Sequence, residues 1–459
     1  MRRAGRRASR GRGLRLLALL ALLGSPAGCR SPAPLAGQGP PAAPGPPADP
    51  DRFLWGHPTT ASFLEADPAS VARDAGMSPA ALARVDSVLL AAVEAGATPG
   101  AALAVGRHGR LVRLRGYGWL DHDRARQASP ASLYDLASLS KVIGTTTAIL
   151  LLEQEGRLSL DDRVVDHLPG WDRGDPAKGT VTLRLLLLHR AGLAAFHTWF
   201  HTLEGKEAYR AALYDEPLQA PPGTRTEYSD LGAMTLGLVV EAASGRALDA
   251  FLEERVFGPL GMDDTGFLPD TTLLPRIAPT EVDTLWRGEH VHGTVHDENA
   301  DAMGGVAGHA GLFSTAFDLA VFADLLLRGG SAPACEPRTG VGVPCPRPRA
   351  RPLELLEPEL LAAYTRRWDG ASSRALGWDT PAGRSSAGDW LTGRAFGHTG
   401  FTGTSIWIDP ELDLYVVLLT NRVNPTRANM GHIELRRAVH DLVAGAITDR
   451  TVSRREGSR

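Results

Sequence analysis

Hydrophobic and polar positions along this chain follow two periods, and each predicts a different kind of element. Ser78 and Pro79 are suited to start a helix whose apolar face carries residues 82, 85, 89 and 92, and Gly96 follows its end. The next run, 99–106, is almost entirely apolar, whereas 110–116 alternates apolar and polar residues. This pattern predicts a strand buried on both faces, followed by a half-exposed strand.

The same two signals recur further along the chain. A helical pattern extends from Leu139 to Glu155 and is closed by Gly156, and Thr182 starts a short buried helix over 183–188. Two strand patterns, 403–408 and 414–419, flank a turn at 409–411. A last helix carries apolar residues at 435, 439, 442 and 446. Because 157–300 has little strand pattern, we predict an α/β (α+β) fold in which both chain ends build one sheet around a mainly helical region.

The first 52 residues have a composition of their own. Residues 1–28 contain seven arginines and no acid, and the apolar core Leu16–Gly24 is too short to span a bilayer, which predicts a signal peptide. The segment Pro26-Ala27-Gly28-Cys29 resembles the lipobox of bacterial lipoproteins, except that Pro26 stands where a leucine-like residue is usual. We therefore predict lipid attachment at Cys29, the alternative being an ordinary signal peptide with an incidental cysteine. A proline-rich tether follows over 29–52.

These boundaries leave a folded domain over 53–448 and a polar tail over 449–459 that we expect to fray. The predicted location is outside the cytoplasm, in the periplasm or at the cell surface, anchored to the membrane by its lipid. Without the seven arginines of residues 1–28, the formal charge falls from −3 to −10. An acidic mature protein argues against nucleic acid, or an anionic membrane surface, as the main partner.

Cys335 and Cys345 lie ten residues apart in an insertion over 329–352 that is rich in proline and glycine. In an exported protein two such cysteines can form a disulfide that restrains the insertion. Two free thiols are the alternative, and we favour the disulfide.

Candidate chemistry begins at Ser138 and Lys141, which are spaced to share one helix face. A serine hydroxyl needs a base to become a nucleophile, and a partly buried neutral lysine can serve, whereas arginine stays protonated. Of the 49 basic residues only three are lysines, the others being Lys178 and Lys206, so a lysine here is notable. Alone, the pair is equally consistent with a serine N-cap followed by a solvent-exposed lysine.

Two further motifs follow Ser138-x-x-Lys141 in order, namely Tyr228-Ser229-Asp230 and His398-Thr399-Gly400. Together they resemble the serine β-lactamase and penicillin-binding protein superfamily, in particular its class C β-lactamase-like branch of D-alanyl-D-alanine carboxypeptidases and esterases. The resemblance covers roughly 78–447, and its further matching segments are Pro99-Gly100, 158–162, Pro222-Gly223-Thr224, 311–319 and 403–407.

The resemblance implies a β-lactamase/transpeptidase-like fold with an antiparallel sheet flanked by helices. It implies that Ser138 attacks a carbonyl carbon while Lys141 and Tyr228 share its proton. The backbone N–H groups of Ser138 and Phe401 would form the oxyanion hole. Substrate would bind along Thr399 and Gly400, with Asp230 also at the substrate-binding site. His398 would hold a substrate carboxylate when charged or simply donate a hydrogen bond.

Two residues depart from the common motifs. His398 stands where lysine is usual and is found in esterase and D-alanyl-D-alanine peptidase members, which argues against a dedicated β-lactamase. Asp230 replaces asparagine and places an anion near Lys141, and an anion there would raise the lysine pKa and oppose a neutral base. In that case Tyr228 carries more of the base role, or Asp230 acts as an indirect partner.

Five other residues invite a metal-site interpretation: His290, His292, His296, Asp297 and His309. Their spacing matches no common metal motif, so we favour hydrogen bonding within loops and predict neither metal nor cofactor.

The predicted function is an exported serine hydrolase that forms an acyl-enzyme with D-alanyl peptides of the cell wall, or with related amides or esters. The alternatives are a carboxylesterase or weak β-lactamase of the same fold, and an inactive relative that binds a ligand or peptidoglycan.

Overall fold

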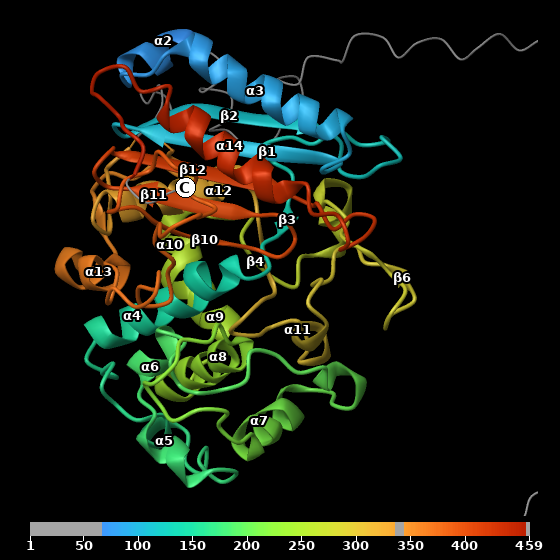
Figure 1. Ribbon diagram of the computed structural model, residues 1–459, viewed down its shortest axis with the longest axis vertical. Coiled ribbons are helices and arrows are strands. Elements are labelled where there is room, and N and C mark those ends of the chain that lie inside the picture. Colours follow the sequence, from blue (N-terminus) through green and yellow to red (C-terminus); the bar gives the residue numbers. More distant parts are fainter. Residues whose placement is uncertain (1–66, 336–343, 456–459) are drawn as a thin grey trace, which may run out of the picture. The chain divides into compact units, whose positions relative to one another are not determined.

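A five-stranded antiparallel sheet organises the computed structural model, which describes residues 67–335 and 344–455 (Figure 1). Its strands are ordered β10-β11-β12-β1-β2. They comprise β1 (Gly100–Arg107), β2 (Arg110–Gly118), β10 (Phe396–Thr399), β11 (Ser405–Asp409) and β12 (Leu414–Thr420). β1 and β12 pair directly, with Leu103 opposite Leu418. The predicted sheet built from both chain ends is therefore confirmed.

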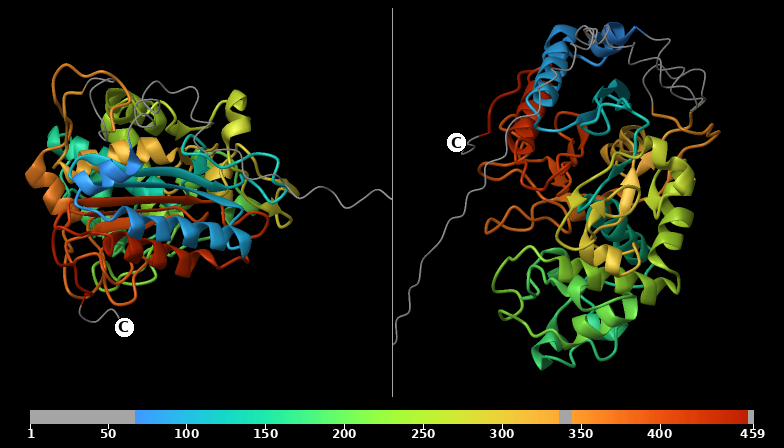
Figure 2. Two further views of the ribbon diagram at one scale, coloured as in Figure 1. Left: turned by 90° about the horizontal axis from the view of Figure 1, so that it is seen from above. Right: turned by 90° about the vertical axis from the view of Figure 1, so that its right-hand side faces the viewer.

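Burial on both faces explains the apolar sequence of β1, all of whose residues are buried. Leu103 and its alternate neighbours pack with α3 (Pro79–Glu94) and α14 (His432–Ala444). Ala102 and Ala104 belong to the core on the opposite face, together with α12 (Ala316–Leu327). Figure 2 shows α3 and α14 side by side along the sheet. The shorter α2 (Pro68–Asp74) precedes α3.

A mainly helical region lies between the strands of the two chain ends, as predicted. Its α-helices are α4 (Thr147–Gln154), α5 (Val164–His167), α6 (Leu183–Leu187), α7 (Lys206–Asp215), α8 (Asp230–Ser244), α9 (Leu248–Leu252), α10 (Gly258–Leu260) and α11 (Glu298–Ala302). Its π-helical and 3-10 segments are η2 (Lys141–Thr146), η3 (Pro176–Thr180), η4 (Trp199–His201), η5 (Glu253–Phe257) and η6 (Thr271–Arg276). α13 (Pro358–Thr365) follows the cysteine-containing insertion.

Three small sheets accompany the main one. The first is ordered β3-β7-β4 and comprises β3 (Tyr134–Asp135), β7 (Leu312–Ser314) and β4 (Gly266–Phe267). The others pair β5 (Val282–Asp283) with β6 (Glu289–His290), and β8 (Ser331–Ala332) with β9 (Leu353–Glu354). β3 ends directly before the turn that carries Ser138, so the first of these sheets positions the candidate nucleophile.

The predicted helix starts and stops agree with the structure. The Ser78 hydroxyl accepts from the Ala81 N–H at the start of α3, and the Thr182 hydroxyl accepts from the Leu185 N–H at the start of α6. The helix expected from Leu139 continues to the end of α4, but its first turns over Lys141–Thr146 are π-helical. A π segment of this kind is frequent at functional sites.

The predicted disulfide is present, since Cys335 and Cys345 are bonded with their Cα atoms 6.1 Å apart. The expectation that the chain frays after Thr448 is wrong for the described tail residues. Asp449 pairs with the buried Arg107 at 2.8 Å, and Arg455 donates to the Leu391 carbonyl at 3.0 Å. A buried guanidinium requires an anion, and the tail provides it.

The predicted signal peptide, the tether and Cys29 all lie outside the described residues. Within the described ranges, no single helix is long and apolar enough to cross a membrane. The pair α8 and Leu248–Leu260, bent by 70°, passes that test of length and composition only when taken together.

Candidate active site

Ser138 lies in a turn that the preceding residues hold in an uncommon conformation. Ala137 has a φ of 47°, a left-handed value that a side chain normally disfavours. The buried Asp135 carboxylate supports this turn by accepting from the Ala137 N–H at 2.7 Å and from the His296 N–H at 2.6 Å. The backbone before Ser138 is therefore fixed by a carboxylate from β3, which restricts where the hydroxyl can point.

Lys141 is buried and donates to Ser138 Oγ at 2.8 Å, as the spacing predicted. It also donates to the His309 carbonyl at 2.9 Å, and its Nζ lies 2.7 Å from Asp230 Oδ1. Two of these contacts are hydrogen bonds, and the contact with Asp230 is an ion pair. Burial lowers the pKa of Lys141, but the charges of Asp230 and Tyr228 outweigh it and raise that pKa. Lys141 is therefore a cation in this arrangement.

Asp230 and Tyr228 flank the residue that starts α8. The Ser229 hydroxyl accepts from the Gly232 N–H at 3.1 Å and donates to the Ala194 carbonyl at 2.6 Å. Asp230 is the first residue of α8, and its N–H donates to the Ala195 carbonyl. A serine N-cap thus fixes both neighbours against the loop over 194–195, with the Asp230 carboxylate directed at Lys141.

Tyr228 lies among cationic and imidazole side chains. Lys141 Nζ and Arg374 Cζ are each 5.1 Å from the centroid of its ring. The rings of His189 and His398 lie 4.6 Å and 5.9 Å away. Its hydroxyl oxygen is buried and has no hydrogen-bond partner among the described residues. An uncommitted hydroxyl in this position is available to a substrate.

His398 is buried in β10, and its Nδ1 atom lies 2.9 Å from the Thr399 carbonyl oxygen. A carbonyl can only accept, so Nδ1 carries the proton and Nε2 has a free lone pair. Nε2 is buried without a partner in the described part of the chain. Burial, with Arg374 and Lys141 nearby, lowers the pKa of His398 well below its ordinary value. The structure therefore argues against a charged His398 that holds a carboxylate, and against donation from Nε2.

The loop over 400–404 is tied to the backbone that precedes Ser138. The Thr402 hydroxyl donates to the Asp135 carbonyl at 2.7 Å, and the Thr404 hydroxyl donates to the Leu136 carbonyl at 3.0 Å. Arg436 of α14 donates to the Gly400 and Thr404 carbonyls at 2.6 and 2.7 Å. These contacts hold the chain at Phe401 close to the Ser138 turn.

The two backbone N–H groups predicted for the oxyanion hole are those of Ser138 and Phe401. Within the described residues, neither donates to a backbone carbonyl. Both are therefore available for a developing oxyanion. The Phe401 side chain is 49% exposed, and its ring stacks on His296 with the centroids 5.7 Å apart.

These groups border a pocket of about 390 Å³. It is lined by Ser138, Tyr228, Arg374, Asp379, His398, Thr399, Gly400, Phe401, Arg422, Met430, His432 and Arg436. Arg374, Arg422 and Arg436 make no ion pair with a carboxylate in the described ranges. Burial lowers the pKa of Arg436 to about 9, so it remains a cation near neutral pH. The pocket therefore favours an anionic ligand.

The sequence interpretation missed these three arginines. They come from two loops and from α14, and no motif links them. Arginine is the common base in this chain, so a single arginine carries little information there. Their convergence depends on how the strands near the C-terminus return to the Ser138 turn.

The histidines considered for a metal site have separate partners. His296 contacts Glu281 at 2.9 Å, and His309 contacts Asp297 at 2.9 Å. Within the described ranges, no group of three histidine, cysteine, aspartate or glutamate side chains is arranged to hold a metal ion. Instead, His309 positions the carbonyl that holds Lys141.

Comparison with known proteins connects this geometry to a family. Residues 85–441 match the family model described as "Beta-lactamase". A curated relative from Escherichia coli (strain K12), named "Putative D-alanyl-D-alanine carboxypeptidase", is 33% identical over 331 residues, which is 64% of this chain and 70% of the relative. An "N-acetylmuramyl-L-alanine amidase" from Bacillus subtilis (strain 168) is 31% identical over 378 residues, or 74% and 81% of the two chains.

Solved structures give the same architecture. A penicillin-binding protein homolog from Caulobacter crescentus superposes with a TM-score of 0.62 and 22% identity, covering 80% of this chain and 99% of the other. EstCE1, "a hydrolase with promiscuous acyltransferase activity", superposes with a TM-score of 0.61 and 23% identity, covering 80% and 98%. At these identities the structures bear on the fold alone, and they agree with the predicted antiparallel sheet and helices.

Proposed function

Since the chain belongs to the Beta-lactamase family, within the serine β-lactamase and penicillin-binding protein superfamily, we propose that it forms an acyl-enzyme at Ser138 and releases D-alanine from cell-wall peptides. Hydrolase chemistry follows from the family. The nucleophile and the substrate are our proposals. The observation that carries them is the contact of Ser138 Oγ with the Lys141 ammonium, which Asp230 holds in place at 2.7 Å.

In this mechanism Lys141 acts as a cation. Its N–H points at Ser138 Oγ and stabilises the negative charge that develops as the serine loses its proton. A protonated lysine cannot accept that proton, so another group must take it. Tyr228 is the remaining candidate, because its hydroxyl is buried and uncommitted and because Lys141 and Arg374 can stabilise a phenolate there.

The proton then has a defined route. Tyr228, acting as the phenolate, takes it from Ser138 as the serine oxygen attacks the carbonyl carbon, and returns it to the leaving nitrogen when the C–N bond breaks. The backbone N–H groups of Ser138 and Phe401 would hold the oxyanion, each such donor contributing about 3–4 kcal/mol to barrier lowering. In the second half of the reaction Tyr228 takes a proton from water as the water oxygen attacks the acyl carbon, and it returns the proton to Ser138 Oγ when the ester bond breaks.

The arginines of the pocket support a substrate with a carboxylate near the scissile bond. A peptide that ends in D-alanine has its terminal carboxylate one residue beyond that bond, and guanidinium groups recognise carboxylates well. The printed name of the Escherichia coli relative points to the same substrate class. A neutral His398 leaves carboxylate binding to Arg374 and its neighbours.

A carboxylesterase is the second candidate, because His398 replaces the usual lysine and Phe401 presents an exposed apolar surface at the pocket.

We also retain the proposal that the protein is exported and anchored through Cys29. A Cys29→Ala variant should then move from the membrane fraction to the soluble fraction, and an unchanged distribution would contradict the anchor.

Mass spectrometry after exposure to a penicillin and to an activated ester tests the acyl-enzyme. We expect a covalent adduct on Ser138 that a Ser138→Ala variant does not form. Release of D-alanine from a sugar-free pentapeptide tests the substrate. Fast hydrolysis of short-chain esters without D-alanine release would favour the esterase, and unchanged ester turnover in Ser138→Ala would reject the nucleophile.

A further inference from the structure

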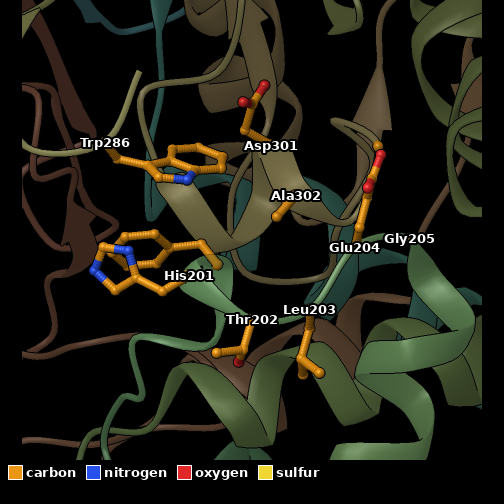
Figure 3. A pocket seen from close by; sticks show the side chains of 10 residues that line it. His201, Thr202, Leu203, Glu204, Gly205, Trp286, Asp301 and Ala302 are labelled. Atoms are coloured by element: carbon orange, nitrogen blue, oxygen red, sulfur yellow. The ribbon is translucent and has the colours of Figure 1, made fainter. Parts of the chain in front are cut away.

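A second pocket, of about 640 Å³, is larger than the one beside Ser138 and adjoins the short helix α11 (Figure 3). The N-cap of α11 is Asp297, which contacts His309, and the His309 carbonyl accepts from Lys141. The pocket lies at the other end of α11, where Asp301, Ala302 and Gly304 line it. Five helical residues span about 7.5 Å, and α11 connects this pocket through Asp297 and His309 to the lysine that contacts Ser138.

Aromatic rings form one wall of this pocket. The Phe200 and Trp286 centroids are 5.2 Å apart in an edge-to-face arrangement, and the His201 ring lies 4.2 Å from Phe200. The Phe200 N–H donates to the Oδ1 of the buried Asn299, which fixes the loop against α11. Aromatic residues make up only 6% of the chain, so this gathering is unusual for it.

Polar groups complete the pocket. Figure 3 shows Trp286 and His201 on one side, Glu204 on the opposite side, and Ala302 between them. Glu204 and Thr202 are exposed, and Asp301 is partly exposed. The pocket therefore combines flat apolar rings with acceptors and donors that face solvent, at a volume typical of ligand pockets.

The charges favour a neutral ligand over a cationic one. Arg287 Nε donates to Asp301 Oδ2 at 3.1 Å, so this carboxylate is already neutralised. The Arg287 guanidinium also lies 4.7 Å from the centre of the Trp286 ring, which places a cation against the indole. A second cation bound at Trp286 would be repelled by Arg287. A ligand that combines an apolar ring face with hydroxyl groups meets no such repulsion.

We propose that this second pocket binds a pyranose ring of a saccharide joined to the peptide that reacts at Ser138. The apolar face of the sugar packs on Trp286 or Phe200, and its hydroxyls hydrogen-bond to Glu204 and Thr202. The inference rests on the proposed function, because a cell-wall peptide carries a glycan at its other end. It identifies the substrate as a glycopeptide rather than a free peptide.

Binding of the disaccharide N-acetylglucosaminyl-N-acetylmuramic acid, without peptide, to the Ser138→Ala protein tests the site directly. Calorimetry should show binding that Trp286→Ala weakens at least tenfold. Leu285→Ala is the matched control, since Leu285 is 73% exposed in the same loop and does not line the pocket. Absence of binding, or equal losses in both variants, would overturn the proposal, as would stronger binding of N-acetyl-lysine amide at Trp286. Thermal denaturation verifies that each variant folds.

A kinetic comparison separates this inference from the proposed function. The attached disaccharide should raise kcat/KM for D-alanine release at least tenfold over the sugar-free pentapeptide, mainly through KM, and Trp286→Ala should abolish the difference. Disaccharide binding without D-alanine release from either substrate would refute the proposed peptidase and leave the sugar site standing. D-alanine release with the same kcat/KM for the substrates with and without the disaccharide would refute the sugar site and leave the proposed peptidase standing.

Discussion

Replacing Asp230 with asparagine separates the two roles that Lys141 could have in catalysis. The Lys141 Nζ and Asp230 Oδ1 atoms are 2.7 Å apart, and the two side chains are 5% and 18% exposed. The asparagine side chain keeps the size and one hydrogen-bond acceptor but removes the negative charge. The substitution therefore changes the protonation of Lys141 without removing either side chain.

The magnitudes indicate that Lys141 would lose its proton in this variant. Two charges 2.7 Å apart attract by roughly 6 kcal/mol at an effective dielectric constant of about 20. Leaving a buried ammonium without its anion costs about 3–5 kcal/mol. Deprotonating a lysine of ordinary pKa at pH 8 costs about 3 kcal/mol. Once Asp230 no longer raises the pKa of Lys141, burial is opposed only by Tyr228, so the pKa falls and the neutral amine forms at lower pH.

The assay is kcat/KM for hydrolysis of p-nitrophenyl butyrate between about pH 6 and about pH 10. If Lys141 acts as a cation, Asp230→Asn loses activity, and its alkaline limb moves to lower pH because the neutral amine forms earlier. Asp379 lines the same pocket without contacting Lys141, so Asp379→Asn should leave that limb in place. A higher kcat/KM for Asp230→Asn near pH 8 would refute the reasoning and make Lys141 the base.

Three further substitutions test other parts of the structure. Arg374→Ala should reduce kcat/KM about tenfold more for a D-alanyl peptide than for a neutral ester, because a guanidinium–carboxylate contact is worth about 1.5–3 kcal/mol, and equal losses would contradict this. Ser229→Ala should lower the free energy of unfolding by about 1–2 kcal/mol in urea denaturation through loss of the N-cap of α8, and an unchanged midpoint would contradict it. Burial lowers the pKa of His440 to about 4, so its contribution to stability is lost as pH falls from about 6.5 to about 4. His440→Gln keeps a donor for the Ser386 carbonyl and should reduce the stability difference between pH 7 and pH 5 by about 2 kcal/mol, and an unaltered difference would contradict it.

The features that sequence could predict are those encoded locally. The spacing of Ser138 and Lys141 determines their contact, and the N-caps at Ser78 and Thr182 determine where two helices begin. The unbroken apolar pattern of β1 indicated burial on both faces, which requires helices on both sides of the sheet.

What sequence could not predict depends on residues that meet only after folding. The protonation of Lys141 balances burial against a carboxylate whose distance no spacing gives. His398 was expected to hold a carboxylate or to donate a hydrogen bond, but the Thr399 carbonyl fixes its proton on Nδ1. Asp449 lies in a polar stretch that suggested fraying, and its partner Arg107 is far away in the sequence.

The pairing of β1 with β12 also bears on when the protein becomes active during synthesis. Ala101 lies opposite Thr420, so β1, which is buried along its whole length, lacks one neighbour until β12 has been made. Arg436, which holds the carbonyls of the loop at Phe401, is made later still. A nascent chain that already contains Ser138, Lys141 and Tyr228 therefore has no assembled site. In the proposed mechanism, activity at Ser138 is therefore acquired only after α14 has been made, because Arg436 of that helix holds the loop at Phe401.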